Sequence, residues 1–377
     1  MRRLLLLVGA IVFVDTMFFA ALTPLLPHYS RELGLSKAGA GVLQAAYPVG
    51  TLVGAVPAGL VTARFGVKPA VLVGLSIVGV TSVVFGFAHD AWVLDAARFL
   101  QGAAGSFSWT GALTWLITAA PARRRGELIG TALGVAIGGA LFGPVLGGVA
   151  SHTGTGPAFI VVAVLALSLA ALAGATHGTP VRSRQPASAL IVAARAPRVV
   201  TGVWFVMLPG LLFGTLSVLG PLRLSHLGFG SLAIGATWVV AAGFEALASP
   251  AVGRLSDRRG RRRPLLASLA AATVALCVIP WPSSAWVLAV VIVCAGISFG
   301  TFWAPAMSLL ADAAEERGVE HGWAFTLMNI AWAPGQATGA AGGGALAKAT
   351  SDAAVYLALA ALCALNLAAL WRSRSSW

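Results

Sequence analysis

Long apolar runs recur along the whole chain, and short polar segments separate them. Twelve runs can be drawn, at residues 4–26, 38–62, 69–88, 92–119, 128–150, 157–175, 199–219, 231–252, 264–281, 285–310, 322–346 and 353–371. Each is close to the roughly 20 residues that an α-helix needs to cross the hydrocarbon core of a bilayer. No run alternates like a transmembrane strand, and a helix satisfies its own backbone groups in lipid. The pattern therefore predicts an all-α membrane protein with twelve transmembrane helices.

The second half of the chain repeats the first. A shift of 194 residues places AWVL at 91–94 on AWVL at 285–288, and LG at 33–34 on LG at 227–228. Because each half holds an even number of spans, both halves cross the membrane in the same sense, and their pseudo-symmetry axis lies along the membrane normal. We therefore expect two pseudo-symmetric six-helix halves. Their bounds are 1–175 and 199–377, and a cytoplasmic linker that contains prolines and arginines joins them at 176–198.

The composition and the placement of charge agree with a membrane protein. Hydrophobic residues make up 58% of the 377 residues and charged residues only 10%, whereas soluble proteins have about 45–50% and about 25%. The net charge of +13 would suggest nucleic acid in a soluble protein. However, 20 of the 25 basic residues fall on the side of the chain termini and only four on the other side. This asymmetry is the positive-inside rule, so we expect a multi-pass cell-membrane protein with both termini cytoplasmic and no nucleic-acid partner.

Asp15, Arg98 and Glu245 are ionisable residues deep inside predicted spans, and they are the candidate proton-coupling residues. Such residues are costly in lipid and usually face a cavity or a proton path. Burial favours a neutral carboxyl and a bound cation favours a charged one, so a proton and a cationic substrate would compete at Asp15. Structural alternatives are a permanently neutral or bonded Asp15, an ion pair between Arg98 and Asp95, and a helix–helix hydrogen bond from Glu245. The repeat places Ile292 opposite Arg98, so the second half does without this arginine.

Aromatic side chains also gather in the spans, where they could attract a cation through their π faces. The alternative is that they face lipid or the protein core. The candidate substrate cavity combines aromatic and polar side chains: Asp15, Phe18, Phe19, Gln101, Trp109, Trp238, Glu245, Trp303, Asn329 and Trp332.

The fifth span carries glycines at fixed spacing, followed by a proline. The set is Gly130, Gly139, Gly143, Pro144, Gly147 and Gly148. Small residues let helices approach closely and slide, and a proline permits a bend because it removes one backbone hydrogen bond. We expect this face to move against the other half; the alternative is a static packing face.

The loop between the second and third spans of each half carries a glycine- and arginine-rich motif. The candidate cytoplasmic gate comprises Gly59, Arg64, Gly66 and Lys68 in the first copy, and Gly253, Asp257, Arg258, Gly260, Arg261 and Arg262 in the second. The second copy holds an aspartate at Asp257, whereas the first has Ala63 at that position.

These two motifs, together with the RFLQG segment at 98–102, resemble the twelve-span drug:proton antiporters of the major facilitator superfamily (MFS) along almost the whole chain. The resemblance implies the MFS fold and proton coupling that involves Arg98. It implies a gating role for the loop motifs, in which Asp257 faces the arginines at 123–125, and Arg64 and Lys68 face acids in 312–320. It also implies export of small hydrophobic, cationic compounds in exchange for protons by rocking of the two halves. We expect a monomer that needs no cofactor or metal.

Three other functions are weighed against this one. A proton-coupled exporter of a sugar or an endogenous metabolite would have the same architecture. A non-transporting membrane sensor is disfavoured because the loops are too short for a signalling domain. An enzyme is disfavoured because the chain has no metal-ligand spacing, nucleophile elbow or phosphate loop.

Overall fold

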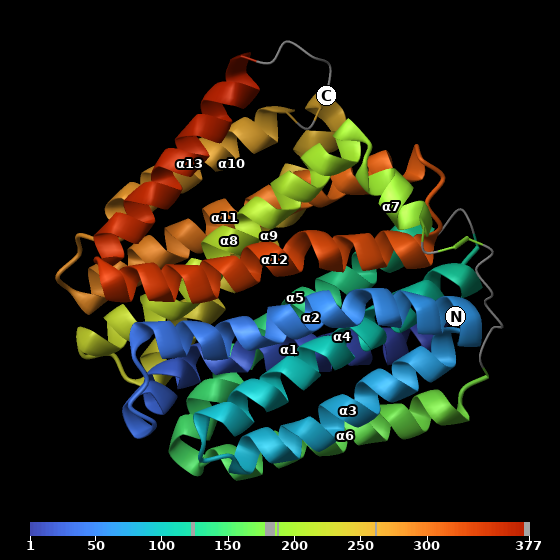
Figure 1. Ribbon diagram of the computed structural model, residues 1–377, viewed down its shortest axis with the longest axis horizontal. Coiled ribbons are helices and arrows are strands. Elements are labelled where there is room, and N and C mark those ends of the chain that lie inside the picture. Colours follow the sequence, from blue (N-terminus) through green and yellow to red (C-terminus); the bar gives the residue numbers. More distant parts are fainter. Residues whose placement is uncertain (122–124, 178–184, 187, 261, 373–377) are drawn as a thin grey trace.

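A computed structural model describes residues 1–121, 125–177, 185–186, 188–260 and 262–372 (Figure 1). Within these ranges the helices are α1 Arg2–Glu32, α2 Lys37–Phe65, α3 Val67–Phe87, α4 Ala91–Ala119, α5 Arg125–Thr153, α6 Thr155–Ala175, α7 Ser188–Ala194, α8 Pro197–His226, α9 Ser231–Arg259, α10 Arg262–Val278, α11 Ala285–Glu315, α12 His321–Ala349 and α13 Asp352–Arg372. Every predicted span coincides with one helix, and the short α7 lies in the linker.

Helix length follows the apolar runs, with polar extensions. Among the described residues, nine helices are long and apolar enough to cross a membrane, and α4, α10 and α12 occupy the remaining predicted spans. Helices α1, α8 and α9 continue six or seven residues past the predicted runs. Helix α1 includes Pro24 near the end of its predicted run and Pro27 in the extension; transmembrane helices tolerate such prolines because neighbouring groups satisfy the freed carbonyls.

The helices form two bundles that lie side by side, α1–α6 in one and α8–α13 in the other (Figure 1). Helix α2 packs along α12 and helix α5 along α9 at the boundary between the bundles. We call the end of the molecule with the N-terminus and α7 the linker end. The other end, with the loops at 33–36, 227–230 and 350–351, is called the far end.

The backbone reproduces the sequence repeat. Gly34 and Gly228, which the 194-residue shift superimposes, have φ angles of 63° and 99°. Gly66 and Gly260, in the two loop motifs, have φ angles of 93° and 78°. Residues with a side chain rarely adopt such angles, so the glycines of both copies are required for the same turn in each half.

Helices α1 and α8 meet where the repeat predicts the symmetry axis. The Arg31 side chain donates a hydrogen bond from Nη1 to Ser225 Oγ, at 2.9 Å, and these residues are 194 positions apart. Residues related by a two-fold operation can touch only close to the axis. The pseudo-symmetry axis therefore passes between the far ends of α1 and α8.

The glycines of α5 lie against α1, in the same half. A Cβ atom added to Gly143 would lie 2.5 Å from the Met17 carbonyl oxygen and 2.6 Å from Ala20 Cβ. Gly139 and Gly147 face the α1 backbone in the same way. The prediction that these three glycines slide against the other half is therefore wrong, because they allow α5 to pack closely on α1 of the same half.

A different face of α5 reaches the second half. A Cβ on Gly148 would meet Leu232 of α9 at 3.1 Å, and a Cβ on Gly235 of α9 would meet the Pro144 carbonyl oxygen at 2.7 Å. Gly130, at the linker end, would meet nothing within 4 Å. Of the predicted set, Pro144 and Gly148 contact the other half, at the far end.

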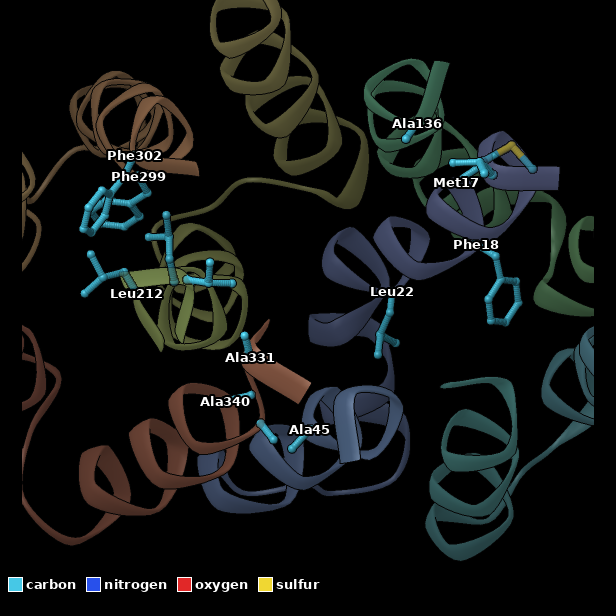
Figure 2. Packing of buried hydrophobic residues seen from close by; sticks show 14 of the residues in the cluster. Met17, Phe18, Leu22, Ala45, Ala136, Leu212, Phe299, Phe302, Ala331 and Ala340 are labelled. Atoms are coloured by element: carbon cyan, nitrogen blue, oxygen red, sulfur yellow. The ribbon is translucent and has the colours of Figure 1, made fainter. Parts of the chain in front are cut away.

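Buried apolar side chains continue across the boundary between the halves (Figure 2). Ala45 of α2 and Ala340 of α12 lie at this boundary, next to each other in Figure 2. A Cβ on Gly41 of α2 would lie 2.5 Å from the Ala340 carbonyl oxygen. Small residues thus bring α2 and α12 into direct backbone contact.

Candidate functional site

Asp15 lies midway along α1, and two neighbouring helices bind its carboxylate. The Tyr47 hydroxyl of α2 donates to Asp15 Oδ2 at 3.0 Å, and the Trp109 indole N–H of α4 donates to the same oxygen at 2.7 Å. Only 6% of Asp15 is exposed. Neighbouring helices therefore bond Asp15, and two aromatic donors supply the bonds.

Close packing of α2 on α4 places these donors. A Cβ on Gly105 of α4 would lie 2.5 Å from the Tyr47 hydroxyl oxygen and 3.0 Å from Asp15 Oδ1. A Cβ on Gly54 of α2 would lie 2.7 Å from Cα of Ala103. Side chains at the two glycine positions would push α2 away from α4, and Tyr47 would no longer reach the carboxylate.

Arg98 is 1% exposed and lies in an aromatic enclosure. Its guanidinium carbon is 4.9 Å from the centre of the Tyr47 ring and 5.3 Å from that of Phe18. The two Nη atoms approach the Phe18 and Phe19 carbonyl oxygens at 3.5 and 3.3 Å. No ion pair joins Arg98 to Asp95, although both are described. Tyr47 instead connects the charges, because its ring faces Arg98 and its hydroxyl binds Asp15.

Glu245 lies at a separate place, between α9 and α11. A Cβ on Gly300 of α11 would lie 2.5 Å from Glu245 Oε1. None of the hydrogen bonds or ion pairs found among the described residues involves Glu245. The structure therefore packs this acid within the second half and does not place it beside Asp15.

One part of the predicted cavity is assembled across the two halves. The Phe19 ring of α1 is 5.6 Å from the Trp332 ring of α12, and 5.0 Å from the Tyr47 ring. Because Trp109 and Tyr47 both bind Asp15, these aromatic side chains and the acid form a single cluster. We call Asp15, Phe19, Tyr47, Trp109 and Trp332 the aromatic–acid cluster.

Other predicted cavity residues point elsewhere. Gln101 is fully buried, and its Nε2 donates to the Thr81 carbonyl oxygen of α3 at 3.1 Å. Phe18 packs edge to face on Phe85 and Phe159 in the core of the first half. Trp238 lies 2.9 Å from where a Cβ on Gly220 would be. Trp303 and Asn329 are partly buried on α11 and α12.

At the linker end, a contact that the sequence did not indicate joins the halves. A Cβ on Gly59 of α2 would lie 2.7 Å from Trp323 and from Thr326 Oγ1 of α12. The linker residue Gln185 accepts a bond from the Trp323 indole N–H at its backbone oxygen, 3.1 Å away. Gly59, from the predicted gate, thus belongs to the α2–α12 boundary.

The charged gate residues make contacts within their own halves. Lys68 donates to the Gly174 carbonyl oxygen of α6, and Glu316 pairs with Arg198 at 2.6 Å. The expected pairing of Lys68 with acids of the second half is therefore absent in this conformation. Arg262 donates to the Leu370 and Trp371 carbonyl oxygens of α13, and Arg64 is exposed.

The remaining gate prediction lies outside the described residues. This applies to residues 122–124 and Arg261, and to the side chains of Arg125, Asp257 and Arg258, while Gly253 lies within α9. The expected pairing of Asp257 with the arginines at 123–125 stays a prediction.

At the far end, an ion pair joins the halves. Lys37 Nζ, at the start of α2, lies 2.6 Å from Asp352 Oδ1, at the start of α13. The carboxylate also lies in the first turn of α13, where the helix dipole favours negative charge. This pair supplements the Arg31–Ser225 bond and the packing of α5 on α9.

Comparison with known proteins identifies the family. The profile described as Major Facilitator Superfamily matches residues 8–336 and, in a second match, residues 244–376. The chain belongs to the major facilitator superfamily. It is therefore a secondary transporter and a multi-pass membrane protein that carries a small-molecule substrate, and MFS proteins are not enzymes.

Curated relatives and solved structures agree with this assignment. The chain is 24% identical over 264 residues to the "Uncharacterized MFS-type transporter YcaD" of Escherichia coli O7:K1, which covers 69% of this chain and 68% of the relative. An uncharacterized MFS-type transporter of Yersinia pseudotuberculosis is 25% identical over 263 residues, with 68% and 67% covered. The nucleoside transporter NupG superimposes with a TM-score of 0.76 over 98% of this chain and 100% of NupG, at 13% identity. At that identity the likeness to NupG shows the fold alone.

Proposed function

We propose that this MFS protein exports small hydrophobic cations in exchange for protons. The observation that carries the proposal is the aromatic–acid cluster, in which a buried carboxylate lies among rings contributed by both halves. Aromatic faces attract cations, and a carboxylate adds the charge that a cation or a proton can neutralise. Such a cluster suits a substrate with an apolar body and one positive charge.

Electrostatics explains why proton and substrate exchange. Arg98 carries a positive charge close to Asp15, so the pair is neutral when the carboxylate is ionised. Adding either a proton or a monovalent cation brings the site to the same net charge. Adding both would place two positive charges in a poorly solvated region, where repulsion is much stronger than in water. Occupancy by one ligand therefore opposes occupancy by the other.

The contacts between the halves support alternating access. Lys37–Asp352, Arg31–Ser225 and the α5–α9 packing hold the far end closed. At the linker end, α2 contacts α12 at Gly59 and Trp323, whereas Gly130 of α5 has no neighbour within 4 Å of its added Cβ. We propose that the linker end is cytoplasmic, as the basic residues indicate, in the inner membrane of a bacterium. We propose that a single chain is the functional unit.

The test is transport of tetraphenylphosphonium and other lipophilic cations by the purified protein in proteoliposomes with an imposed pH gradient. We expect gradient-driven movement by the wild type and its loss in Asp15→Asn, because the amide has the same size but cannot exchange a proton. Asp95→Asn, which neutralises another acid of the first half, serves as the control and should transport normally. Proton-driven transport by Asp15→Asn at the wild-type rate would refute the role of Asp15. No movement of any cation would favour the sugar or metabolite exporter.

A further inference from the structure

We infer that Tyr47 and Trp109 are positioning residues that set the pH at which Asp15 exchanges its proton. The inference rests on the proposed function, in which Asp15 carries the proton. Neither residue belongs to the motifs that carry the resemblance to the family, and Tyr47 was absent from the predicted site.

The two donors bind one oxygen and leave the other open. The Trp109 N–H and the Tyr47 O–H both donate to Asp15 Oδ2, at 2.7 and 3.0 Å. Among the described residues, none donates to Oδ1, which faces the α4 backbone at Gly105. A proton on Oδ2 would oppose two donors, because a protonated oxygen offers fewer lone pairs to them. The proton therefore binds at Oδ1, and Oδ2 stays fixed as an acceptor.

The donors also bias the equilibrium between the two forms of the carboxyl. A hydrogen bond to an ionised acceptor is stronger than one to a neutral acceptor. Tyr47 and Trp109 therefore stabilise the ionised form more than the protonated form. Removing either donor should make the carboxyl retain its proton to a higher pH, by about one pH unit per donor.

Other charged groups near Asp15 are few. Tyr47 on α2 and Arg98 on α4 are the titratable side chains beside it. Helix α6 carries none. The other described titratable side chains on the helices that pack on α1 lie near helix ends or against other helices: Lys37 and Arg64 on α2, Asp95 on α4, His152 on α5, Arg198, Arg223 and His226 on α8, and Glu245 and Arg254 on α9. The variants must therefore distinguish the effect of the two donors, Tyr47 and Trp109, from the effect of Arg98.

The experiment compares Tyr47→Phe and Trp109→Phe with matched controls. Tyr356→Phe removes a buried hydroxyl that has no partner among the described residues. Trp204→Phe removes an indole donor of the same 2.7 Å length, which binds the neutral Asn366. Both controls lie in the second half. The probe is tetraphenylphosphonium, and the measurement is the pH at which its binding to the protein in liposomes is half maximal.

A second measurement does not need the probe. Infrared titration follows the C=O stretch of the protonated Asp15, which Asp15→Asn identifies because it removes that band. We expect the band to persist to a pH about one unit higher in Tyr47→Phe and in Trp109→Phe. Its frequency should rise as well, because the C=O oxygen loses a hydrogen bond. A purely structural role for the two side chains would not produce this spectral change.

The outcomes separate this inference from the proposed function. Shifted midpoints in both variants, with unshifted controls, support the inference. Wild-type midpoints and an unchanged band in both variants overturn it, while loss of coupled transport in Asp15→Asn would leave the proposed function in place. Coupled transport by Asp15→Asn would remove the proposed function itself. If Trp109→Phe does not fold, Tyr47→Phe alone decides by the same two measurements.

Discussion

Replacing Gly143 by alanine should destabilise the first half by opening the α1–α5 contact. The added methyl would lie 2.5 Å from the Met17 carbonyl oxygen, whereas ordinary van der Waals contact begins at 3.4 Å. The helices must therefore separate by about 0.9 Å, or the α1 backbone must shift. Helices α1 and α5 make many further contacts with each other, so this shift would disturb the whole α1–α5 interface.

The same motif supplies a matched control in Gly130→Ala. An added Cβ at Gly130 meets nothing within 4 Å, so this variant gains only the helix propensity of alanine, about 1 kcal/mol. Gly143→Ala has the same gain and an overpacking cost of about 1–3 kcal/mol. The free energy of unfolding should therefore differ by about 1–3 kcal/mol between the two variants, or about 5- to 150-fold in the unfolding equilibrium constant.

The assay is unfolding in mixed micelles of dodecyl maltoside and increasing sodium dodecyl sulfate, followed by near-ultraviolet circular dichroism of the 12 tryptophans. Gly335→Ala tests the equivalent contact in the second half, because Gly335 faces the Met207 backbone of α8. We expect both Gly143→Ala and Gly335→Ala to unfold before Gly130→Ala. Identical transitions for all three variants would refute the reasoning that these glycines are needed for close backbone approach.

Two further predictions concern the contacts between the halves. Lys37→Asp should open the far end up to about fivefold more often, since a partly exposed ion pair contributes about 0–1 kcal/mol, and adding Asp352→Lys should restore closure. Spin-label distances across the far end measure this opening, and an unchanged distance distribution in Lys37→Asp would contradict the prediction. Gln185→Ala should speed hydrogen exchange at the Glu320 amide, because this amide donates to Gln185 Oε1 at 2.9 Å. The Ala324 amide inside α12 serves as the control, and equal exchange rates at Glu320 in the wild type and in Gln185→Ala would show that Gln185 does not protect it.

The sequence predicted the helices well because the signal for each span is local. Runs of apolar residues decide which segments enter lipid, and the 194-residue repeat shows that the halves share one topology. Helix ends were less predictable, since polar residues such as Arg31 continue a helix beyond the lipid at little cost. The apolar pattern therefore marks where the membrane ends, not where the helix ends.

The site was predictable only in part because its contacts are long-range. Asp15 stands out in an apolar run because it is charged, whereas Tyr47 carries no charge and does not stand out. Its role depends on the α2–α4 crossing, which the spacing in one helix does not specify. The α5 glycines show the same limit, because spacing identified a close helix contact but not that the partner was α1.

The bond between Arg31 and Ser225 has a consequence for how the two halves diverged. In an assembly of two identical six-helix chains, the residue at this position would meet its own copy at the axis. Two arginines there would repel each other, and two serines would leave a weaker contact. A single fused chain can place different residues on the two sides, as it does with Asp15 and Pro209, Tyr47 and Ala241, and Arg98 and Ile292. A fused chain therefore does not need a self-complementary axis. One half could acquire Asp15, Tyr47 and Arg98 while the equivalent positions of the other half stayed apolar.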